Sequence, residues 1–447
     1  MKDQCGCATT HAPTIDPERL AMSLFHISSK DRTWRLGVRA SLAIGTALVT
    51  VAALAGSAAA GASSTTTLSF YSWDGAATMA PLFAEFMKEN PNIKLEVTYG
   101  TPVIGYISAL QVRLNSGTAP DVFIITAENK QQIMDGGFAK DLSNEPFVSN
   151  LAAAAKATYT KDGKLYGAAV SSWGGGIIYN MDLLAKVGVT TPPRTWPSFI
   201  RLCKKLKAAG ITPFYEAGDG IPVSLVALLG VENKQLGGIM DADIFSGKSS
   251  FAKTWTGPLT TWSQLFTSGA ESRSVAGLTG NQVMTEFEKG SVAMTATGSW
   301  ALGSIETAAP SLKLKFMAVP GVSASSTFWM GAVSPGYAIN AKTPNTAAAE
   351  QFVTFLQSKT GVGLYQKATQ SITTTKNFTP TLDPALKDMA RAVRKGDFYL
   401  PQVSWPSNSA ALNTEATSQL QELILGKTTP AAVAADLDAK LKALLAG

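Results

Sequence analysis

Five tryptophans stand near Gly, Ser, Asp or Pro rather than on periodic apolar stretches: Trp73, Trp173, Trp300, Trp329 and Trp405. An indole ring can stack on the apolar C–H face of a pyranose, while carboxylates, amides and hydroxyls can bind its hydroxyl rim. Because loops often carry binding residues, this pattern suits a site for a neutral sugar, although core packing explains any single tryptophan equally well. Trp196, between Thr195 and Pro197, is better explained as a packing residue at a helix entry.

Three features that could belong to an enzyme do not meet the requirements of their motifs. Gly247-Lys248-Ser249 resembles the end of a phosphate-binding loop, but Ala242 stands where that motif needs glycine. Gly174-Gly175-Gly176 follows no clear strand, so we expect a flexible connection rather than a dinucleotide site. A glycosidase needs a carboxylate pair, and no spacing selects one among Asp74, Glu128, Glu216 and Asp219. We predict no catalytic residue.

Histidine and cysteine are nearly confined to the first 60 residues, which hold His11, His26, Cys5 and Cys7. The rest of the chain has no histidine and a single cysteine, Cys203. This composition excludes Ser-His and Cys-His catalytic pairs, the usual zinc sites and an internal disulfide there. We expect Cys203 to be a buried core thiol, and we predict no metal and no cofactor.

The first 60 residues have the pattern of a cleavable signal peptide. Arg32, Arg35 and Arg39 precede an uncharged apolar run, residues 40–60, that ends in Ala58-Ala59-Ala60. Cleavage there would start the mature protein at or near Gly61 and place it in the periplasm or outside the cell. An uncleaved membrane anchor is the alternative, since the run is about long enough to span a bilayer. The remaining chain has a mild, scattered basic excess, which does not indicate nucleic-acid binding.

The remaining chain alternates strand and helix patterns. A strand at 68–71 is followed by a helix whose apolar residues, Met79 to Phe86, recur at helical spacing and which stops at Asn90-Pro91. Further strands are expected at 93–99, 122–125, 177–179, 292–294 and 316–319, and helices at 107–114, 197–209, 349–356, 412–425 and 431–445. A strand as apolar as 122–125 is typical of a buried parallel sheet. We therefore predict two α/β lobes, each with a mostly parallel sheet flanked by helices.

Short motifs in a fixed order carry a resemblance to a known family. The more specific ones are residues 162–167 (DGKLYG), 178–184 (IYNMDLL), 192–196 (PPRTW), 287–290 (FEKG) and 297–300 (TGSW); weaker ones are 83–86, 89–93, 116–122 and 136–142. In this order they are similar to the family 1 extracellular solute-binding proteins, the group that includes maltose-binding protein. The similarity covers nearly all of the chain after residue 60.

The resemblance implies a two-lobe periplasmic-binding-protein-like fold of type II, with the ligand in the interlobe cleft. It divides the chain into a signal peptide (1–60), a first lobe (63–170, with a return segment at 336–380), a second lobe (174–331) and a C-terminal helical segment packing on the second lobe (381–447). It also implies chain crossings near 170–175 and 332–337.

The function implied is that of a non-enzymatic, monomeric carrier that captures a sugar and delivers it to the membrane permease of an ABC importer. A secreted carbohydrate-active enzyme, or a carrier for a sugar phosphate or polyol, is the alternative. The ligand positions carried over are Trp73, Asp74, Thr126, Glu128, Asn129, Trp173, Asp219, Gly298, Ser299, Trp300, Trp329, Gly331 and Trp405. Trp173 stands where maltose-binding protein has a carboxylate, so maltose specificity does not transfer.

Overall fold

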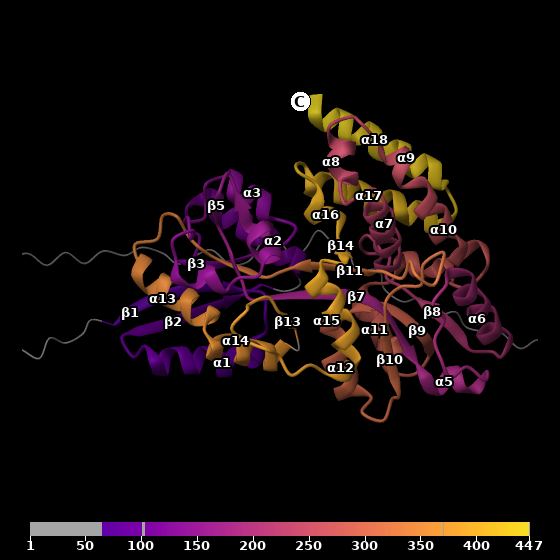
Figure 1. The fold of residues 1–447 in the computed structure, drawn as a ribbon, viewed down its shortest axis with the longest axis horizontal. Coiled ribbons are helices and arrows are strands. Elements are labelled where there is room, and N and C mark those ends of the chain that lie inside the picture. Colours follow the sequence, from indigo (N-terminus) through magenta and orange to yellow (C-terminus); the bar gives the residue numbers. More distant parts are fainter. Residues whose placement is uncertain (1–64, 101–102, 370, 447) are drawn as a thin grey trace, which may run out of the picture. The chain divides into compact units, whose positions relative to one another are not determined.

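The computed structural model describes residues 65–100, 103–369 and 371–446, all of which fall within the unit Ala62–Gly447 (Figure 1). The expected signal peptide, residues 1–60, and its cleavage site lie outside the described residues. Within the described residues, no helix has both the length and the apolar character needed to cross a membrane.

The first sheet has five strands in the order β2-β1-β3-β12-β6. Their bounds are β1 (Thr66–Ser72), β2 (Ile93–Tyr99), β3 (Val122–Ile125), β6 (Ala168–Ala169) and β12 (Gly336–Ile339). β1 pairs in parallel with both β2 and β3, whereas β12 runs antiparallel to β3 and β6. β4 (Thr160–Lys161) and β5 (Lys164–Leu165) form a small separate hairpin. We call this sheet and its helices lobe I.

Apolar helix faces close the core of lobe I. The helices are α1 (Ala76–Glu89), α2 (Val103–Ser116), α3 (Lys130–Asp135), α4 (Ala153–Tyr159), α13 (Thr346–Gln357) and α14 (Lys359–Thr369). Along α1, Met79, Leu82, Phe83 and Phe86 are buried at i, i+3, i+4 and i+7, as the sequence predicts. Phe352 of α13 contacts α1 through Phe86 at 4.8 Å between ring centroids. α1 and α14 also contact each other and lie along the same side of lobe I (Figure 1).

The second sheet is built around the ten-residue strand β7 (Ser171–Asn180) in the order β14-β11-β7-β9-β8. Its other strands are β8 (Thr212–Tyr215), β9 (Val292–Gly298), β11 (Trp329–Val333) and β14 (Phe398–Tyr399), while β10 (Leu314–Met317) and β13 (Ile372–Thr373) also pair with β7. Every partner of β7 runs antiparallel to it. Both sheets are therefore mixed, and the expectation of mostly parallel sheets is wrong in this detail.

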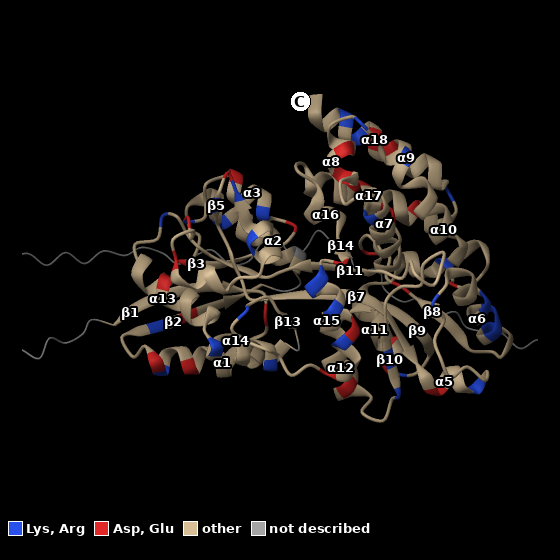
Figure 2. Ribbon diagram, in the orientation of Figure 1, with Lys and Arg blue, Asp and Glu red and all other residues tan. Residues whose placement is uncertain are grey.

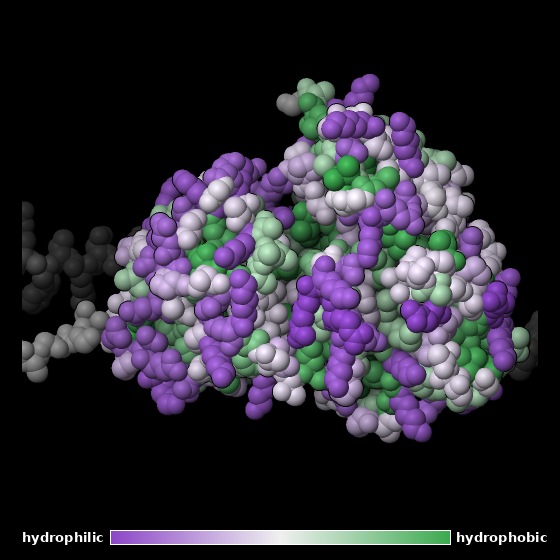
Figure 3. Space-filling view, in the orientation of Figure 1, coloured by the Kyte–Doolittle hydropathy of each residue, from purple (hydrophilic) through white to green (hydrophobic). Residues whose placement is uncertain are grey.

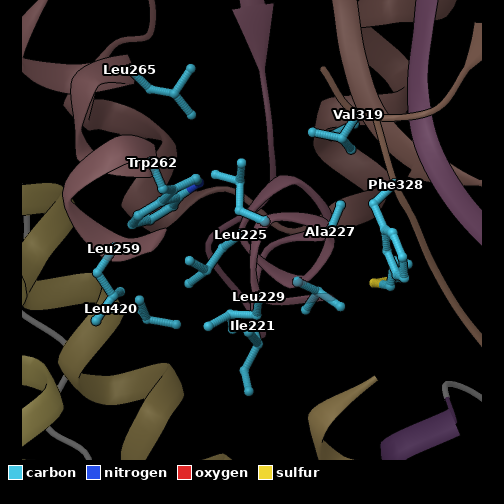
Figure 4. Packing of buried hydrophobic residues seen from close by; sticks show 14 of the residues in the cluster. Ile221, Leu225, Ala227, Leu229, Leu259, Trp262, Leu265, Val319, Phe328 and Leu420 are labelled. Atoms are coloured by element: carbon cyan, nitrogen blue, oxygen red, sulfur yellow. The ribbon is translucent and has the colours of Figure 1, made fainter. Parts of the chain in front are cut away.

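Helices cover the second sheet, and we call the sheet with these helices lobe II. They are α5 (Met181–Lys186), α6 (Trp196–Ala208), α7 (Val223–Gln235), α8 (Met240–Phe245), α9 (Phe251–Thr254), α10 (Thr256–Thr267), α11 (Gly280–Glu288), α12 (Leu302–Ala308), α15 (Lys387–Lys395), α16 (Pro401–Ser404), α17 (Ser409–Leu425) and α18 (Pro430–Ala446). Figure 4 shows part of the core, where Leu225 of α7 lies near Leu259 and Trp262 of α10. α18 contacts α9, α10 and α17, so the C-terminal helices belong to this lobe.

Charged and hydrophilic residues lie on the outer surfaces of the helices. α6 has an exposed basic side, and α15 also carries several basic residues (Figure 2). The face seen in Figure 3 is hydrophilic over α15, and hydrophilic and hydrophobic residues are mixed over the rest of it.

The chain passes between the two sheets at three places. β6 and β7 are separated only by Val170, and β11 and β12 only by Ser334 and Pro335. The third passage brings β13 against Ser171 and Ser172 of β7. The chain thus returns to the lobe II sheet by Ile372, earlier than the boundary at 380–381 that the resemblance implies.

Gly174, Gly175 and Gly176 are an internal part of β7, and the expectation of a flexible connection is wrong. A Cβ at Gly174 would come within 2.7 Å of Met389 Sδ, and one at Gly176 would overlap the carbonyl oxygen of Met317. Glycine is needed here because helix and strand atoms pack directly against the β7 backbone.

Candidate functional site

An exposed tryptophan ring lies at the end of β9. The indole of Trp300 folds back over the backbone of Gly298, where any Cβ would overlap the ring. This arrangement leaves Trp300 55% exposed although its ring is held against the chain. The sequence Gly298-Ser299-Trp300 therefore produces an aromatic surface that a larger residue at 298 would displace.

Trp173 extends this aromatic surface from β7. Its ring meets that of Trp300 edge to face, with centroids 5.3 Å apart and planes at 81°. Trp173 is half-buried and packs partly against the lobe II core. Two perpendicular rings of this kind offer one apolar face and one apolar edge to a ligand.

A cavity of about 440 Å³ adjoins Trp300. Its walls come from the loop and helix start at 216–223, from one side of α11 and from the end of β9 with the start of α12. Asp219 is exposed, and its Oδ2 accepts a hydrogen bond from the Gly280 backbone N–H at 3.0 Å. Glu288 Oε1 accepts one from the Ser304 hydroxyl at 3.1 Å. Carboxylate oxygens therefore stand beside an aromatic surface.

Glu216 forms a buried wall of the same cavity. Burial raises the pKa of its carboxyl group to about 7, although hydrogen bonds from Ser224 and Trp262 partly oppose this. Oε1 accepts the Ser224 backbone N–H at 2.7 Å. Burial also raises the pKa of Glu271 well above its ordinary value, and the nearby Glu216 charge adds to this effect. Burial therefore favours the protonated form of both carboxyl groups relative to carboxyl groups in water.

In lobe I, Trp73 and Asp74 follow β1 in a turn where the Asp74 backbone N–H donates to Ser72 Oγ at 3.0 Å. Burial raises the pKa of Asp74 to about 7, although hydrogen bonds from Trp73 and Tyr365 oppose this effect. Asp74 Oδ2 is a buried acceptor with no hydrogen-bond donor among the described residues. Trp73 itself contacts Tyr106 edge to face at 6.0 Å.

The loop after β3 is organised by its own side chains. Asn129 Oδ1 accepts the Thr126 backbone N–H at 2.8 Å, and Thr126 Oγ1 accepts those of Glu128 and Asn129. Thr126 and Asn129 are buried, so their main role in this conformation is to hold Glu128. Burial raises the pKa of Glu128, while burial lowers that of Lys130 to about 8 despite the Glu128 charge.

Two tyrosines connect these loops with the crossing strands. Tyr365 lowers the pKa of Asp74, and Ser171, which precedes Trp173 by two residues in β7, in turn lowers the pKa of Tyr365. The Tyr159 hydroxyl donates to the Val333 carbonyl oxygen at 3.1 Å. The Glu128 charge helps to raise the pKa of Tyr159. The structure therefore brings Asp74, Glu128 and Trp173 toward the crossing, and Trp173 reaches Trp300 at the cavity.

Comparisons with known proteins show the family of this chain. The family model described as "Bacterial extracellular solute-binding protein" matches residues 71–363. This chain belongs to that family. A solved family 1 extracellular solute-binding protein from Bifidobacterium longum subsp. infantis is 32% identical, with a TM-score of 0.71 over 85% of this chain and 100% of that one.

Two further relatives extend the comparison. The "Multiple sugar-binding protein" of Streptococcus mutans is 26% identical over 65% of this chain and 70% of its own length. The structure "SBP RafE in complex with raffinose" is 23% identical, with a TM-score of 0.72 over 84% of this chain and 99% of that one. The likeness to RafE concerns the fold alone. Together with the two mixed sheets, these comparisons show the two-lobe fold of type II.

Seven of the thirteen expected ligand residues are buried in the structure of this solute-binding protein. Thr126 and Asn129 organise the loop that holds Glu128, and Gly298 lies beneath the Trp300 ring; the other four are Ser299, Trp329, Gly331 and Trp405. Trp405 is 1% exposed and packs against Trp255 in the lobe II core, and Trp329 packs against Phe316 at 5.1 Å. Gly331 lies within β11, where a Cβ would approach the Trp173 carbonyl oxygen. Ser299 is buried. We leave these four out of the site because buried atoms cannot touch a ligand in this conformation.

The sequence analysis missed one whole side of the cavity. Asn281, Met284, Thr285 and Glu288 line it at i, i+3, i+4 and i+7 along α11. That spacing, next to the capping residue Thr279, was visible in the sequence and could have identified the helix face. Tyr365 could not be found this way, because it meets Asp74 only through the tertiary fold.

Cys203 is buried on the inner face of α6, as expected, and burial raises the pKa of its thiol, which disfavours a reactive thiolate. Across residues 65–446, apart from the three positions left undescribed, no group of three or more His, Cys, Asp or Glu side chains is placed to hold a metal ion.

Proposed function

We propose that this solute-binding protein captures a sugar in a cleft between lobe I and lobe II and delivers it to the permease of an ABC importer. The observation that carries the proposal is the combination of a held, exposed indole, Trp300, with a cavity lined by carboxylate, amide and hydroxyl groups. Such a combination matches the apolar face and the hydroxyl rim of a pyranose.

The comparisons support a sugar as the ligand. The name of the Streptococcus mutans relative states that it binds multiple sugars, and that protein matches most of this chain. A cavity of about 440 Å³ is within the range of small-ligand sites. The proposed contacts are Trp73, Asp74 and Glu128 from lobe I, with Trp173, Asp219 and Trp300 from lobe II. Gly298 would act by supporting the Trp300 ring. Thr126 and Asn129 would act by positioning Glu128.

Delivery to a membrane partner fits the family's extracellular description. We propose that residues 1–60 direct export and are removed near Gly61, and that the mature carrier is a monomer without enzymatic activity. Lobe closure would then create a surface that a permease can distinguish from the open carrier.

The test is titration calorimetry of the purified chain, starting at Gly61, against a panel of neutral and charged mono- and oligosaccharides. We expect at least one sugar to bind with a dissociation constant in the micromolar range or tighter, with no hydrolysis product by chromatography. Absence of binding across the panel would overturn the sugar proposal. Turnover of any panel sugar would favour an enzyme instead.

A further inference from the structure

The charge around the cavity is one-sided. Glu216, Asp219 and Glu288 line it, and its lining residues include no Lys or Arg. Asp74 and Glu128, two further proposed contacts, belong to lobe I and do not line this cavity, and Lys130 is a basic neighbour of Glu128. Basic residues instead occupy outer helix surfaces such as α6 and α15 (Figure 2).

Eleven of the described carboxylates have a basic partner, and none of these eleven lines the cavity. Glu286 of α11 pairs with Lys289 at 3.0 Å, and Glu422 pairs with Lys427 at 3.1 Å. None of the ion pairs found among the described residues includes Asp219 or Glu288, although Glu288 belongs to the same helix as Glu286. The recorded partners of these two carboxylates are neutral, namely the Gly280 N–H and the Ser304 hydroxyl.

Unpaired negative charge beside a partly enclosed cavity has direct consequences for ligand choice. An anionic ligand such as a sugar phosphate would be repelled by Asp219 and Glu288, with no basic lining residue to compensate. A cationic group would gain charge-assisted hydrogen bonds from the same carboxylates. It could also lie against the exposed face of Trp300, whose ring attracts cations. In lobe I, the buried Asp74 Oδ2 accepts no hydrogen bond from the described residues.

We propose that this site prefers a sugar that carries a protonated amine, with the pyranose ring on Trp300 and the ammonium group between Asp219 and Glu288. This inference rests on the proposed function and narrows its substrate class from sugars in general to cationic amino sugars. It also makes a sugar phosphate the least favoured class of ligand.

The experiment compares two oligosaccharides of equal length that differ only at nitrogen. One is the glucosamine trisaccharide, which carries free amines, and the other is its fully N-acetylated form, which is neutral. Calorimetry at slightly acidic pH, where the amines are protonated, should show about tenfold tighter binding of the free amine form. The preference should shrink as salt concentration rises, because partly exposed charge pairs are screened.

The variants Asp219→Asn and Glu288→Gln keep the size of the side chains and remove the charge. We expect each to lower the ratio of the two affinities several-fold, and the double variant to abolish the preference. Glu286→Gln is the matched control, since it removes a carboxylate from the same helix that pairs with Lys289 and does not line the cavity. It should leave the ratio unchanged.

The outcomes distinguish the preference for a cationic amino sugar from sugar capture in general. Equal or weaker binding of the free amine form, with the neutral form bound, would overturn the cationic preference and leave sugar capture standing. A preference that survives in the double variant would also overturn it, because the charge would then act elsewhere. Failure of both trisaccharides, together with every sugar of the panel, would overturn the proposed function itself.

Discussion

At the residue scale, Trp300 is a binding surface prepared in advance. Its ring is held over Gly298 and meets Trp173 edge to face, yet it remains 55% exposed. A side chain that is already ordered loses little rotamer freedom when a ligand arrives. The free energy of stacking can then appear almost fully as affinity.

Replacing Trp300 should therefore affect binding more than folding. We expect Trp300→Ala to weaken sugar binding by roughly 1–3 kcal/mol and to lower the melting temperature much less than a core substitution does, because the residue is 55% exposed. Trp196, which is 1% exposed in the lobe II core, provides the contrast: Trp196→Ala should cost roughly 3–5 kcal/mol of stability. Calorimetry and thermal melts on both variants check this. Normal binding by Trp300→Ala would contradict the assignment.

Gly298→Ala tests the same surface through the backbone. The added methyl group would occupy the space of the Trp300 ring, so the indole must rotate away. We expect a loss of affinity close to that of Trp300→Ala, and little further loss when both changes are combined, since they remove one feature. Gly303→Ala is the control, because nothing lies within 4 Å of a Cβ at that position. Additive losses in the double variant would argue against this coupling.

Glu216 should make stability depend on pH. Its pKa is about 7 in the folded protein against an ordinary value of 4.5, so the folded state binds more protons between these values. Through Glu216, the free energy of unfolding should therefore fall as pH rises from about 4.5 to about 7, and the raised pKa of Glu271 should extend this fall to higher pH. Raised pKa values at Asp74 and Asp241 act in the same direction. Glu216→Gln should make the free energy of unfolding depend less on pH, as measured by chemical denaturation without ligand. An unchanged dependence on pH would refute this.

At the element scale, the C-terminal helix α18 caps the N-terminus of α9, another helix of lobe II. Both carboxylate oxygens of Asp438 accept backbone N–H groups at the start of α9, from Phe251 at 2.7 Å and Ala252 at 2.9 Å. A carboxylate at a helix N-terminus satisfies donors that have no partner within the helix. α9 is thereby capped from 187 residues away in the sequence.

Asp438→Ala should lower stability by about 1–2 kcal/mol, because two N–H groups lose their acceptor. Asp436→Ala is the matched control, as that residue is exposed two positions earlier on the same helix. Chemical denaturation of both variants measures the difference. Equal stabilities would show that water replaces the Asp438 carboxylate without cost.

Elements with a clear apolar period could be predicted from sequence, and those fixed by distant contacts could not. Val122–Ile125 and Ile93–Tyr99 are strands at the expected residues, and α6 ends one residue before the expected position, followed by Gly210 at φ +73°. The glycine run 174–176 carries no such period. Its strand conformation depends on Met389 and Met317, which are far away in the sequence.

The residues of the candidate site also divide into those that could be predicted from the sequence and those that could not. Trp73 and Trp300 could be proposed from their local context, whereas Asp74, Glu128 and Asp219 could be proposed only from the family resemblance. Trp405 has a similar local context, yet Trp255 and Phe251 enclose it in the core. Local sequence does not encode which partner reaches a tryptophan, so exposure of an isolated aromatic residue cannot be derived from its neighbours.

At the scale of the whole molecule, the proposed contacts come from both lobes. Trp73, Asp74 and Glu128 stand on loops that follow β1 and β3 of the first sheet, whereas Asp219 and Trp300 stand on lobe II. The connecting passages are short, with Val170 between β6 and β7 and Ser334-Pro335 between β11 and β12. A few backbone angles in these passages could therefore change the angle between the lobes.

A sugar should close the lobes, because it can shift the equilibrium between open and closed forms only by binding the closed form better. Contacts from one lobe alone bind both forms equally and would leave the equilibrium unchanged. We expect the radius of gyration from solution scattering to fall when the best sugar saturates the protein, together with a change in tryptophan fluorescence. Trp300→Ala, at the same sugar concentration, should show a smaller response in proportion to its lost affinity. If the radius stays constant while calorimetry shows full occupancy, the sugar contacts one lobe, and the two-lobe clamp is wrong.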